Sequence, residues 1–450
     1  MGLDAEHRHL VSLMPNSRDR LEGMLAAIAD PAGEGARAFT KLYADEARAA
    51  ADAADARARF GHRLSPIDGL VVSIKDLFDV AGETTRAGTI VYADAPRAEA
   101  DAPIVARLRA AGAVIVGRTN MTELAFSGIG INPHYGTPGN PADRRRVPGG
   151  SSSGAAVAVA DQFCDIAIGS DTGGSVRLPA AFCGVTGFKP TQARVPRDGA
   201  MPLSLSLDSV GPLAGTLSLC AATDSILAAE PQRDSGAKPI YHLVLAVARG
   251  PLLSGLDPQI ERAFEAALSR LAKAGARIVD LDLTPLLAIN DAIAAIGSIT
   301  AVECADLHAD VLATAPEKID RRVVQRTRNF SSLTGAQFSR MLRLRAKAIA
   351  AATRAFLPFD AVVLPTCPIF APVTAKLEAD DDLFMRTNLL ALRNTTHFNI
   401  FDCCGLSLPL ADAGPLHAGF MMMGARGTDD RVIAAGLAVE RVFGQARSPA

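Results

Sequence analysis

The chain has 450 residues, of which 49% are hydrophobic, and a formal net charge of −2 at pH 7. This length and hydrophobic content allow a large buried core, in one large α/β unit or in two or three domains. The near-neutral charge, with no basic run longer than Arg144 to Arg146, argues against nucleic-acid and membrane-surface partners.

The seven cysteines predict reduced thiols in a cytoplasmic protein. Their number is odd, and no CxxC or Cys/His spacing is typical of a zinc site, so we expect neither a metal nor another cofactor. The first 20 residues carry charges and no apolar core, which is unlike a signal peptide. No apolar run reaches the roughly 18 residues of a membrane-spanning helix, and we expect no membrane partner.

Residues 16–60 are predicted to form two helices. Asn16 or Ser17 can cap the first, which carries an apolar stripe at helical spacing, and the Ala-rich second helix ends at Gly61. Residues 70–75, LVVSIK, then predict a strand with Lys75 at its end. A helix capped by Asp101 and a short strand, VIVG, follow. This alternation favours an α/β architecture with a largely parallel sheet.

The later part of the chain changes in composition. After Thr191 it is rich in loops, and about 231–359 is more helical; short apolar strands return in AVVLP, CGLSLPL and HAGFMMMG. We expect Met421 to Met423 to lie in a core strand rather than on a substrate surface. The chain is predicted to be one unit, with a helical layer in 1–64, an α/β core in 65–230 and 360–450, and a pocket-shaping part in 231–359.

A glycine-rich turn, SDTGGS, follows the apolar run that ends at Gly169 and places Ser175 at its end. The backbone N–H groups of Thr172, Gly173, Gly174 and Ser175 can converge there on a carbonyl oxygen that gains charge. One such donor stabilises a transition state by about 3 kcal/mol. The alternative is a tight turn whose glycines only satisfy backbone geometry.

A second serine cluster, GGSSSG at 149–154, can be read as G-x-S-x-G with Ser152 as a nucleophile. That motif needs a preceding strand and a later histidine and acid. The preceding residues 138–148 are polar and contain three prolines, and nothing ties His397 or His417 to this serine. The sequence therefore disfavours Ser152 as a nucleophile.

Lys75 is the candidate base. At the end of an apolar run its amine can be desolvated, which lowers a lysine pKa toward neutrality, and Ser-Lys pairs are a known form of serine activation. A surface lysine at a strand end is the alternative.

Together these segments resemble the amidase signature family. GGSSSG and DTGGS place Ser151 and Ser175 24 residues apart (175 − 151 = 24), and Lys75 lies 76 residues before Ser151 (151 − 75 = 76). Further matches are IDGLVVSIKDLFDVAG, TNMTELAFSG, SLDSVGPLA, DAVVLPTCPIFAP and CGLSLP. The resemblance spans about residues 65–445 and implies a single large fold, with a twisted mixed β-sheet covered by helices on both faces.

The resemblance also implies roles for individual residues. Ser175 matches the acylated nucleophile, Ser151 the serine that follows a cis peptide bond and relays a proton, and Lys75 the base. The remaining matches are the oxyanion donors Thr172, Gly173 and Gly174, the supporting residues Asp171, Arg177 and Ser152, and the pocket walls Ala125 and Phe126. A helical region, 291–345, and a loop at 388–397 are expected to close the pocket.

The implied activity is hydrolysis of a linear amide through an acyl-enzyme. Carboxamides, anilides, ureas, carbamates (urethanes) and esters all fit the three residues, and Phe126, Phe330, Phe338 and Phe384 favour an apolar or aromatic group. Alternatives are the glutaminase subunit of a tRNA-dependent amidotransferase, an esterase-type hydrolase, and a binding protein on an inactive fold. The resemblance implies a small-molecule amide or carbamate as the partner, with a homodimer as a common arrangement.

Overall fold

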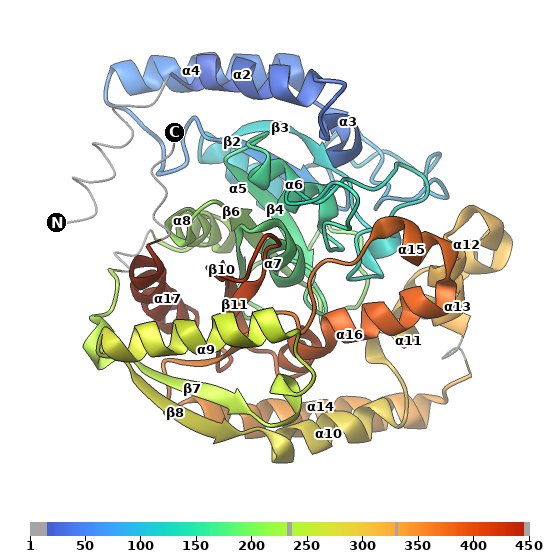
Figure 1. The fold of residues 1–450 in the computed structure, drawn as a ribbon. Coiled ribbons are helices and arrows are strands. Elements are labelled where there is room, and N and C mark those ends of the chain that lie inside the picture. The colour runs from blue at the N-terminus through green and yellow to red at the C-terminus, as the bar shows by residue number, and fades with distance from the viewer. Residues whose placement is uncertain (1–15, 232–235, 329–331, 445–450) are drawn as a thin grey trace.

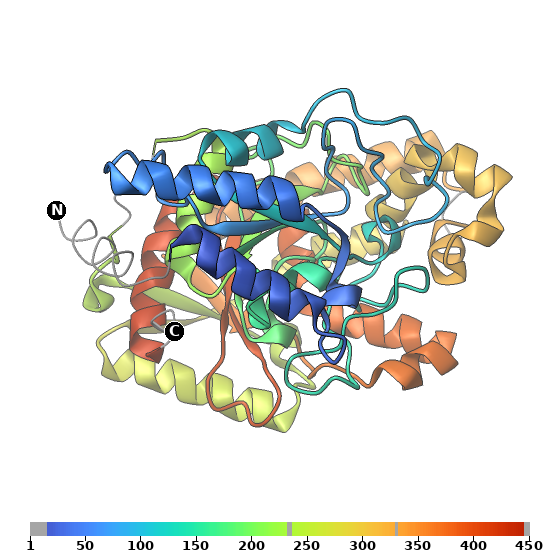
Figure 2. The same cartoon turned by 90° about the horizontal axis from the view of Figure 1, so that it is seen from above.

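The computed structural model describes residues 16–231, 236–328 and 332–444. Through this part of the chain runs one mixed β-sheet of 11 strands, with helices packed against both faces (Figure 1 and Figure 2). The order across the sheet is β1-β3-β2-β4-β6-β5-β10-β11-β9-β7-β8. The predicted α/β class with a central mixed sheet is confirmed.

The strands are four to six residues long. They are β1 (Phe39–Leu42), β2 (Val71–Lys75), β3 (Val114–Thr119), β4 (Ile166–Asp171), β5 (Thr186–Lys189), β6 (Ser209–Ala214), β7 (Val244–Arg249), β8 (Arg277–Asp282), β9 (Ala361–Pro365), β10 (Cys404–Pro409) and β11 (Gly419–Gly424). The sequence pattern does not predict β1, β5 or β6. Glycine lies within β5, and both glycine and proline lie within β6, so pairing with neighbouring strands rather than local propensity makes them strands.

The expectation of a largely parallel sheet is wrong. Strands β3, β2 and β4 are parallel, as are β9, β7 and β8, but every pairing from β4 through β6, β5, β10 and β11 to β9 is antiparallel. The reason lies in the connections. Residues 190–208 join β5 to β6 and residues 410–418 join β10 to β11 without a crossover helix, which parallel neighbours would need.

The helices form layers on the two faces of the sheet (Figure 1 and Figure 2). They are α2 (Ser17–Ala29), α3 (Gly35–Ala38), α4 (Ala44–Arg59), α5 (Pro103–Ala110), α6 (Ser153–Ala160), α7 (Arg177–Cys183), α8 (Leu217–Ala228), α9 (Pro258–Lys273), α10 (Thr284–Ala294), α11 (Ile299–Leu307), α12 (Ala309–Thr314), α13 (Arg321–Arg328), α14 (Gly335–Phe356), α15 (Thr374–Ala379), α16 (Asp381–Ile400) and α17 (Asp429–Phe443). Helices α5, α8, α9 and α17 contribute to one large core, while α2, α4, α6 and α7 contribute to a second.

The helix caps expected at Asn16 and Asp101 have different outcomes. Asn16 caps α2 through a hydrogen bond to the backbone of Asp19, which confirms the prediction for this helix. Asp101 does not cap α5, whose cap position is Ala102. The Asp101 carboxylate instead accepts hydrogen bonds from the Ala81 N–H and the Arg109 side chain, so a tertiary contact replaces the local one.

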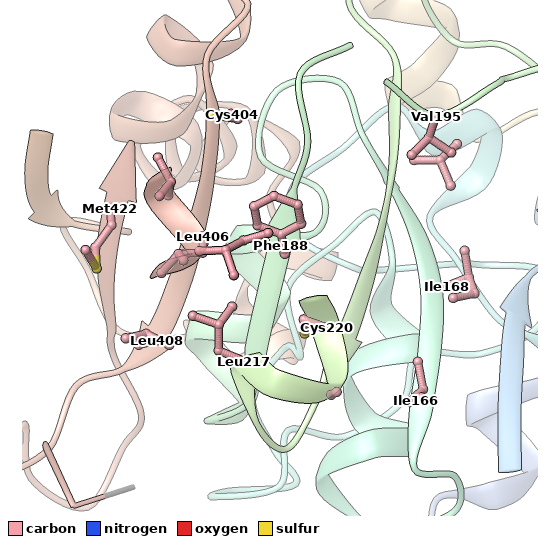
Figure 3. Close-up of a cluster of buried hydrophobic side chains, with 14 of the residues drawn as sticks. Ile166, Ile168, Phe188, Val195, Leu217, Cys220, Cys404, Leu406, Leu408 and Met422 are labelled. Carbon is pink, nitrogen blue, oxygen red and sulfur yellow. The ribbon is translucent and has the colours of Figure 1, made fainter. Parts of the chain in front are cut away.

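The buried core contains the thiols and methionines that the sequence singles out. All seven cysteines are buried, and none forms a disulfide, which agrees with the prediction of free thiols. Met421, Met422 and Met423 are fully buried in β11, which confirms their assignment to a core strand. Figure 3 shows part of the largest core, where Phe188, Leu217 and Leu406 lie between strands and helix α8.

Residues 231–359 supply α9 to α14, but also β7 and β8 at one edge of the same sheet. The division of the chain into a helical layer, a core and a pocket-shaping part stays a prediction. One stretch, Thr284–Leu307, is long and apolar enough for a membrane span by length and composition. It consists of two helices, α10 and α11, whose apolar side chains Leu286, Leu287, Ile293 and Ile299 are buried in the protein.

Candidate active site

Lys75 is the last residue of β2, and its side chain is fully buried. Its Nζ lies 2.7 Å from Ser151 Oγ and 2.8 Å from Ser170 Oγ. Burial lowers the pKa of Lys75 to about 7, although the negative charges of Asp208 and Asp171 act in the opposite direction. The surface-lysine alternative is therefore wrong, and this amine can accept a proton near neutral pH.

The Gly150–Ser151 peptide bond is cis, as the resemblance implies. Both residues are held by the segment 122–128. The Thr122 N–H donates to the Ser151 carbonyl oxygen at 3.0 Å, and the Gly150 N–H donates to the Gly128 carbonyl oxygen at 2.8 Å. Ser151 is fully buried, and its hydroxyl group is in contact with Lys75.

Ser175 lies in the turn between β4 and α7, with 5% of its surface exposed. The Ser152 N–H donates to the Ser175 carbonyl oxygen at 3.3 Å, so the two serine clusters of the sequence meet in space. Lys75 binds the first cluster through Ser151. The structure thus brings the three predicted residues into one site.

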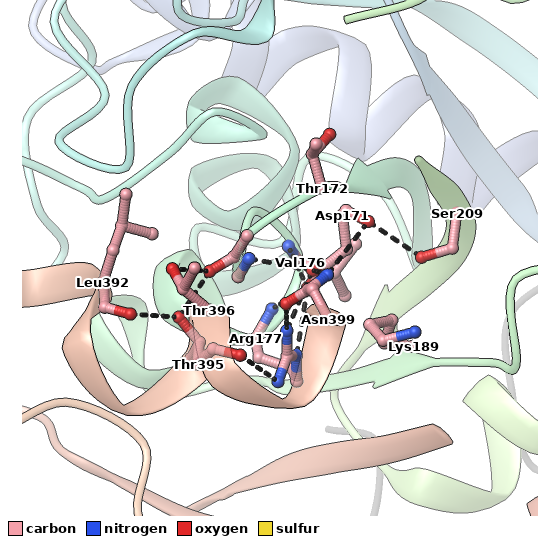
Figure 4. A network of polar contacts seen from close by, with 12 residues as sticks. Asp171, Thr172, Val176, Arg177, Lys189, Ser209, Leu392, Thr395, Thr396 and Asn399 are labelled. Atoms are coloured by element: carbon pink, nitrogen blue, oxygen red, sulfur yellow. Dashed lines mark hydrogen bonds and ion pairs between the residues drawn. The ribbon is translucent and has the colours of Figure 1, made fainter. Parts of the chain in front are cut away.

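The Asp171 carboxylate organises the turn that carries Ser175 (Figure 4). It accepts hydrogen bonds from the Gly174 N–H at 2.8 Å, the Val176 N–H at 3.1 Å, the Arg177 guanidinium at 2.9 Å and the Asn399 side chain at 2.8 Å. Burial alone would raise the pKa of Asp171, but the Arg177 guanidinium holds it well below its usual range. The pair is therefore a permanently charged brace.

Helix α16 holds the same turn from the C-terminal part of the chain. The hydroxyl groups of Thr395 and Thr396 both donate to the Gly173 carbonyl oxygen, at 2.6 and 3.1 Å (Figure 4). The expectation of a loop at residues 388–397 is wrong, because they lie inside a 20-residue helix that Asp380 caps. The helix places these polar side chains on one face, toward the turn.

The peptide group between Gly173 and Gly174 is fixed at both ends. Its carbonyl oxygen is held by α16, and its N–H, on Gly174, donates to Asp171. The prediction of Gly174 as an oxyanion donor is therefore wrong for this arrangement, because its donor is already used. The N–H groups of Thr172, Gly173 and Ser175 have no hydrogen-bond partner within the described ranges, so they remain available as donors.

Gly174 still needs to be glycine. Its φ of 137° lies in a region that residues with a side chain rarely adopt, and a Cβ there would be 2.2 Å from Thr395 Oγ1. The glycine therefore lets α16 approach the turn closely.

Ser152 is fully buried and precedes α6. Its hydroxyl donates to the Ser170 carbonyl oxygen at 3.3 Å, and its N–H donates to Ser175. These contacts agree with a supporting position and with the interpretation that Ser152 is not a nucleophile.

A cavity of about 350 Å³ lies beside these residues. Its wall includes Ala125 and Ser170, together with the segment 192–203 and the side chains of Leu205 and Asp208. The sequence pattern of 192–203 indicates only loops and predicts no site role. The cavity reaches the Lys75 contact through Ser170 but does not include Ser175.

Phe126 is not part of this cavity wall. Its ring lies under the Arg326 guanidinium, whose carbon is 3.8 Å from the ring centroid. Phe338 and Phe384 pack in hydrophobic clusters, and Phe330 lies outside the described residues. The aromatic residues proposed from sequence, as far as they are described, therefore do not line the cavity.

Two residues that sequence reasoning did not assign to the site belong to it. Ser170 contacts Lys75, and a usable signal was available: β2 and β4 are parallel neighbours, so their carboxyl ends meet at one edge of the sheet. Asp208 accepts a hydrogen bond from Thr172 Oγ1 at 2.5 Å and from the Leu203 and Ser204 N–H groups. It therefore connects the cavity wall to the turn of Ser175.

Across the described ranges, no group of three or more His, Cys, Asp or Glu side chains is placed to hold a metal ion. The site combines hydroxyl groups, one lysine and backbone N–H groups with the carboxylates of Asp171 and Asp208 and the Arg177 guanidinium.

The family model described as Amidase matches residues 24–433. The chain belongs to the amidase family. The match includes every residue of the site described above, from Lys75 to Asn399. The chain is accordingly an amidase-family hydrolase of C–N bonds.

The sequence is similar to those of a deaminase and of an amidotransferase subunit. The 2-amino-5-chloromuconic acid deaminase of Comamonas testosteroni is 34% identical over 404 residues, which cover 89% of this chain and 87% of the relative. One subunit of the glutamyl-tRNA(Gln) amidotransferase of Anaeromyxobacter dehalogenans is 41% identical over 281 residues, or 60% of this chain and 57% of its own length.

A solved crystal structure described as an amidase has the same fold. It superposes with a TM-score of 0.85 at 31% identity and covers 98% of this chain and 99% of its own.

Proposed function

We propose that this amidase-family chain hydrolyses the C–N bond of a small carboxamide through an acyl-enzyme on Ser175. The observation that carries the proposal is the 2.7 Å contact between Lys75 Nζ and Ser151 Oγ in a fully buried site. Burial lowers the pKa of this lysine to about 7, so the neutral amine that a general base requires is available near neutral pH.

In the first half-reaction, neutral Lys75 accepts a proton from Ser151 while Ser151 accepts the proton of Ser175. The Ser175 oxygen forms a bond to the substrate carbonyl carbon, and the negative charge develops on the carbonyl oxygen. The N–H groups of Thr172, Gly173 and Ser175 donate to that oxygen.

The tetrahedral intermediate then breaks its C–N bond. The proton on Lys75 returns through Ser151 to the departing nitrogen, which leaves as ammonia or an amine. Water attacks the acyl-enzyme by the same relay, so the products are a carboxylic acid and free Ser175.

In this proposal Asp171 and Arg177 hold the donors in place without exchanging protons. Their mutual contact and the hydrogen bonds from Gly174 and Val176 fix the turn before substrate binds. Fixed donors act at once on the developing charge, without reorganisation.

A covalent probe tests the nucleophile. A phosphonate or sulfonyl fluoride should label Ser175, and Ser175→Ala should neither react nor hydrolyse amides. Ser152→Ala is the matched control from the adjacent cluster and should still be labelled. Labelling of Ser152 or of another serine would contradict the proposal.

A substrate panel tests the C–N bond. Primary amides, anilides, ureas and carbamates, with esters for comparison, should be offered to the isolated chain. Lys75→Ala should reduce amide hydrolysis more than ester hydrolysis, because a departing amine needs the returned proton and an alkoxide needs it less. Equal losses on both substrate classes would contradict the role of Lys75.

The second candidate is a glutaminase component of a tRNA-dependent amidotransferase, and the similarity to the Anaeromyxobacter dehalogenans protein favours it. That function requires glutamine as the substrate and further protein components. Ammonia release from glutamine that depends on those added components would support it, whereas hydrolysis of simple amides by the isolated chain would favour the first proposal. A homodimer and a cytoplasmic location stay predictions.

A further inference from the structure

Arg326, on α13, has a guanidinium group with no carboxylate partner in the part of the chain that the structure describes. Its Nη1 donates to the Phe126 carbonyl oxygen, and its guanidinium carbon lies 3.8 Å from the centroid of the Phe126 ring. The side chain is only partly accessible, and burial lowers the pKa of Arg326 to about 10. Its charge is therefore desolvated without being neutralised.

Three fully buried or nearly buried arginines of the chain are neutralised. Each has a carboxylate partner: Arg118 with Asp76 at 2.8 Å, Arg177 with Asp171 at 2.9 Å, and Arg322 with Asp381 at 2.8 Å. An unpaired enclosed charge is costly, so proteins pair such charges or use them to bind a ligand. Arg326, on the same short helix as Arg322, has no such partner among the described residues, and neither do the half-buried Arg345 and Arg393. What distinguishes Arg326 is its contact with Phe126.

The location of Arg326 connects it to the reaction site. It covers the middle of the segment 122–128, whose two ends bind the Ser151 carbonyl oxygen and the Gly150 N–H. Ala125, the neighbour of Phe126, lines the cavity next to Ser170. The unpaired charge therefore lies beside the segment that holds the proposed proton relay.

The described charged groups near Arg326 do not include a carboxylate that pairs with it, so an anion can bind there. The Asp208 carboxylate on the cavity wall already accepts three hydrogen bonds, from Thr172, Leu203 and Ser204. Arg197 also lines the cavity, and its guanidinium donates only to the Leu205 carbonyl oxygen among the described residues. Arg197 on the cavity wall, and Arg326 beside the segment that contributes Ala125 to this wall, thus have no carboxylate hydrogen-bond partner among the described residues.

We propose that Arg326 binds a carboxylate of the substrate, which makes the preferred substrate the half-amide of a small dicarboxylic acid. This inference rests on the proposed amide hydrolysis and adds the chemical class of the acyl group. The planar guanidinium matches a carboxylate with two parallel hydrogen bonds, which a neutral amide cannot form. The cavity of about 350 Å³ suits such a small molecule.

Kinetics on matched substrates test the assignment. Malonamic, succinamic and glutaramic acids should each be compared with the neutral amides propanamide, butanamide and pentanamide. For the best half-amide, Arg326→Met should lower kcat/KM by about 10- to 100-fold, as expected for a charged hydrogen-bonded pair, and leave the neutral amides within about threefold. Arg326→Lys should retain part of the preference, since it keeps the charge.

Arg321→Met is the control, because it removes an arginine from the same helix whose side chain is 70% exposed. It should leave the preference unchanged. Equal losses on charged and neutral amides in Arg326→Met, or no preference for any half-amide in the unmodified enzyme, would overturn the inference.

Binding measurements separate this inference from the proposed reaction. In a Ser175→Ala background, calorimetric titration with the three half-amides should show affinity that Arg326→Met weakens by a similar factor. Binding that does not depend on Arg326, or no binding of any half-amide, would overturn the inference even where Ser175 is labelled and neutral amides are hydrolysed. Failure of labelling at Ser175 would instead contradict the proposed reaction.

Discussion

The two buried charge clusters beside Ser175 differ in how their charges are compensated. Among the described residues, the Lys75 amine forms hydrogen bonds with the hydroxyl groups of Ser151 and Ser170 alone, and burial lowers its pKa to about 7. Asp171 and Arg177 contact each other, and the pKa of Asp171 stays well below its usual range. One cluster can change its charge near neutral pH, whereas the other keeps its charges. The Lys75 cluster is therefore suited to proton transfer, and the pair of Asp171 and Arg177 is suited to holding the turn in place.

Replacing Lys75, whose charge can change near neutral pH, should have the largest effect on activity and the smallest effect on the free energy of unfolding. Lys75→Met should lower kcat for amides by at least about 10³-fold, because the base and the returning proton are both lost. The free energy of unfolding should not fall, since a buried amine without a carboxylate partner is replaced by an apolar chain of similar size. Steady-state kinetics and urea unfolding of the same variant check both expectations. If Lys75→Met lost stability but kept its activity, Lys75 would be a structural residue and not the base.

Replacing Asp171, which keeps its charge, should instead lower the free energy of unfolding strongly. Asp171→Ala leaves the Arg177 guanidinium buried and unpaired, and should lower the free energy of unfolding by about 3–5 kcal/mol. Urea unfolding measures this change. The double variant Asp171→Ala with Arg177→Met should recover part of the loss, because no unpaired charge remains. An unchanged unfolding midpoint in Asp171→Ala would show that the pair does not brace the fold.

The next effect concerns the sign of the pH dependence. Only neutral Lys75 can accept a proton, so kcat/KM should rise with pH through about 7 and level off above it. Because the charge of Asp208 raises the pKa of Lys75, Asp208→Asn should move this rise to lower pH. Initial rates across a pH series check both statements. A rate that falls as pH rises through 7 would contradict the assignment of Lys75 as the base.

The smallest effect should come from α16. Thr395→Val removes one of the two donors to the Gly173 carbonyl oxygen and should lower kcat by about tenfold with little change in KM. Thr396→Val, which removes the longer bond of 3.1 Å, should have less effect. Thr395→Ser, which keeps the hydroxyl, should restore kcat. A loss that appears only in KM would assign α16 to substrate binding instead.

Local pattern was sufficient for the parts of the site that each lie in one segment. Lys75 at the end of β2 follows from an apolar run that stops at a charge. Both serine clusters follow from glycine spacing, and the family resemblance supplied the cis bond at Ser151. Strands β2, β3, β4 and β9 to β11 follow from apolar runs, and Asn16 marks the start of α2.

The remaining features depend on contacts between distant segments, which one sequence does not show. The use of the Gly174 N–H by Asp171 is a matter of peptide orientation, and the amino-acid type carries no signal of it. The contact of Phe126 with Arg326 joins two residues that are 200 positions apart in the sequence, since Arg326 lies on α13. The antiparallel middle of the sheet depends on which strands become neighbours, because strands of similar composition can pair in either direction.

The contact between α16 and Gly173 also has a consequence for biosynthesis. Lys75, Ser151 and Ser175 are all synthesised before residue 180, whereas the hydroxyl groups that hold Gly173 come from Thr395 and Thr396. A nascent chain that comprises only the first half of the sequence contains each proposed reacting group and the Asp171–Arg177 pair, but not the α16 hydroxyl groups that hold Gly173. The full set of contacts that fix the turn can therefore form only after α16 has left the ribosome.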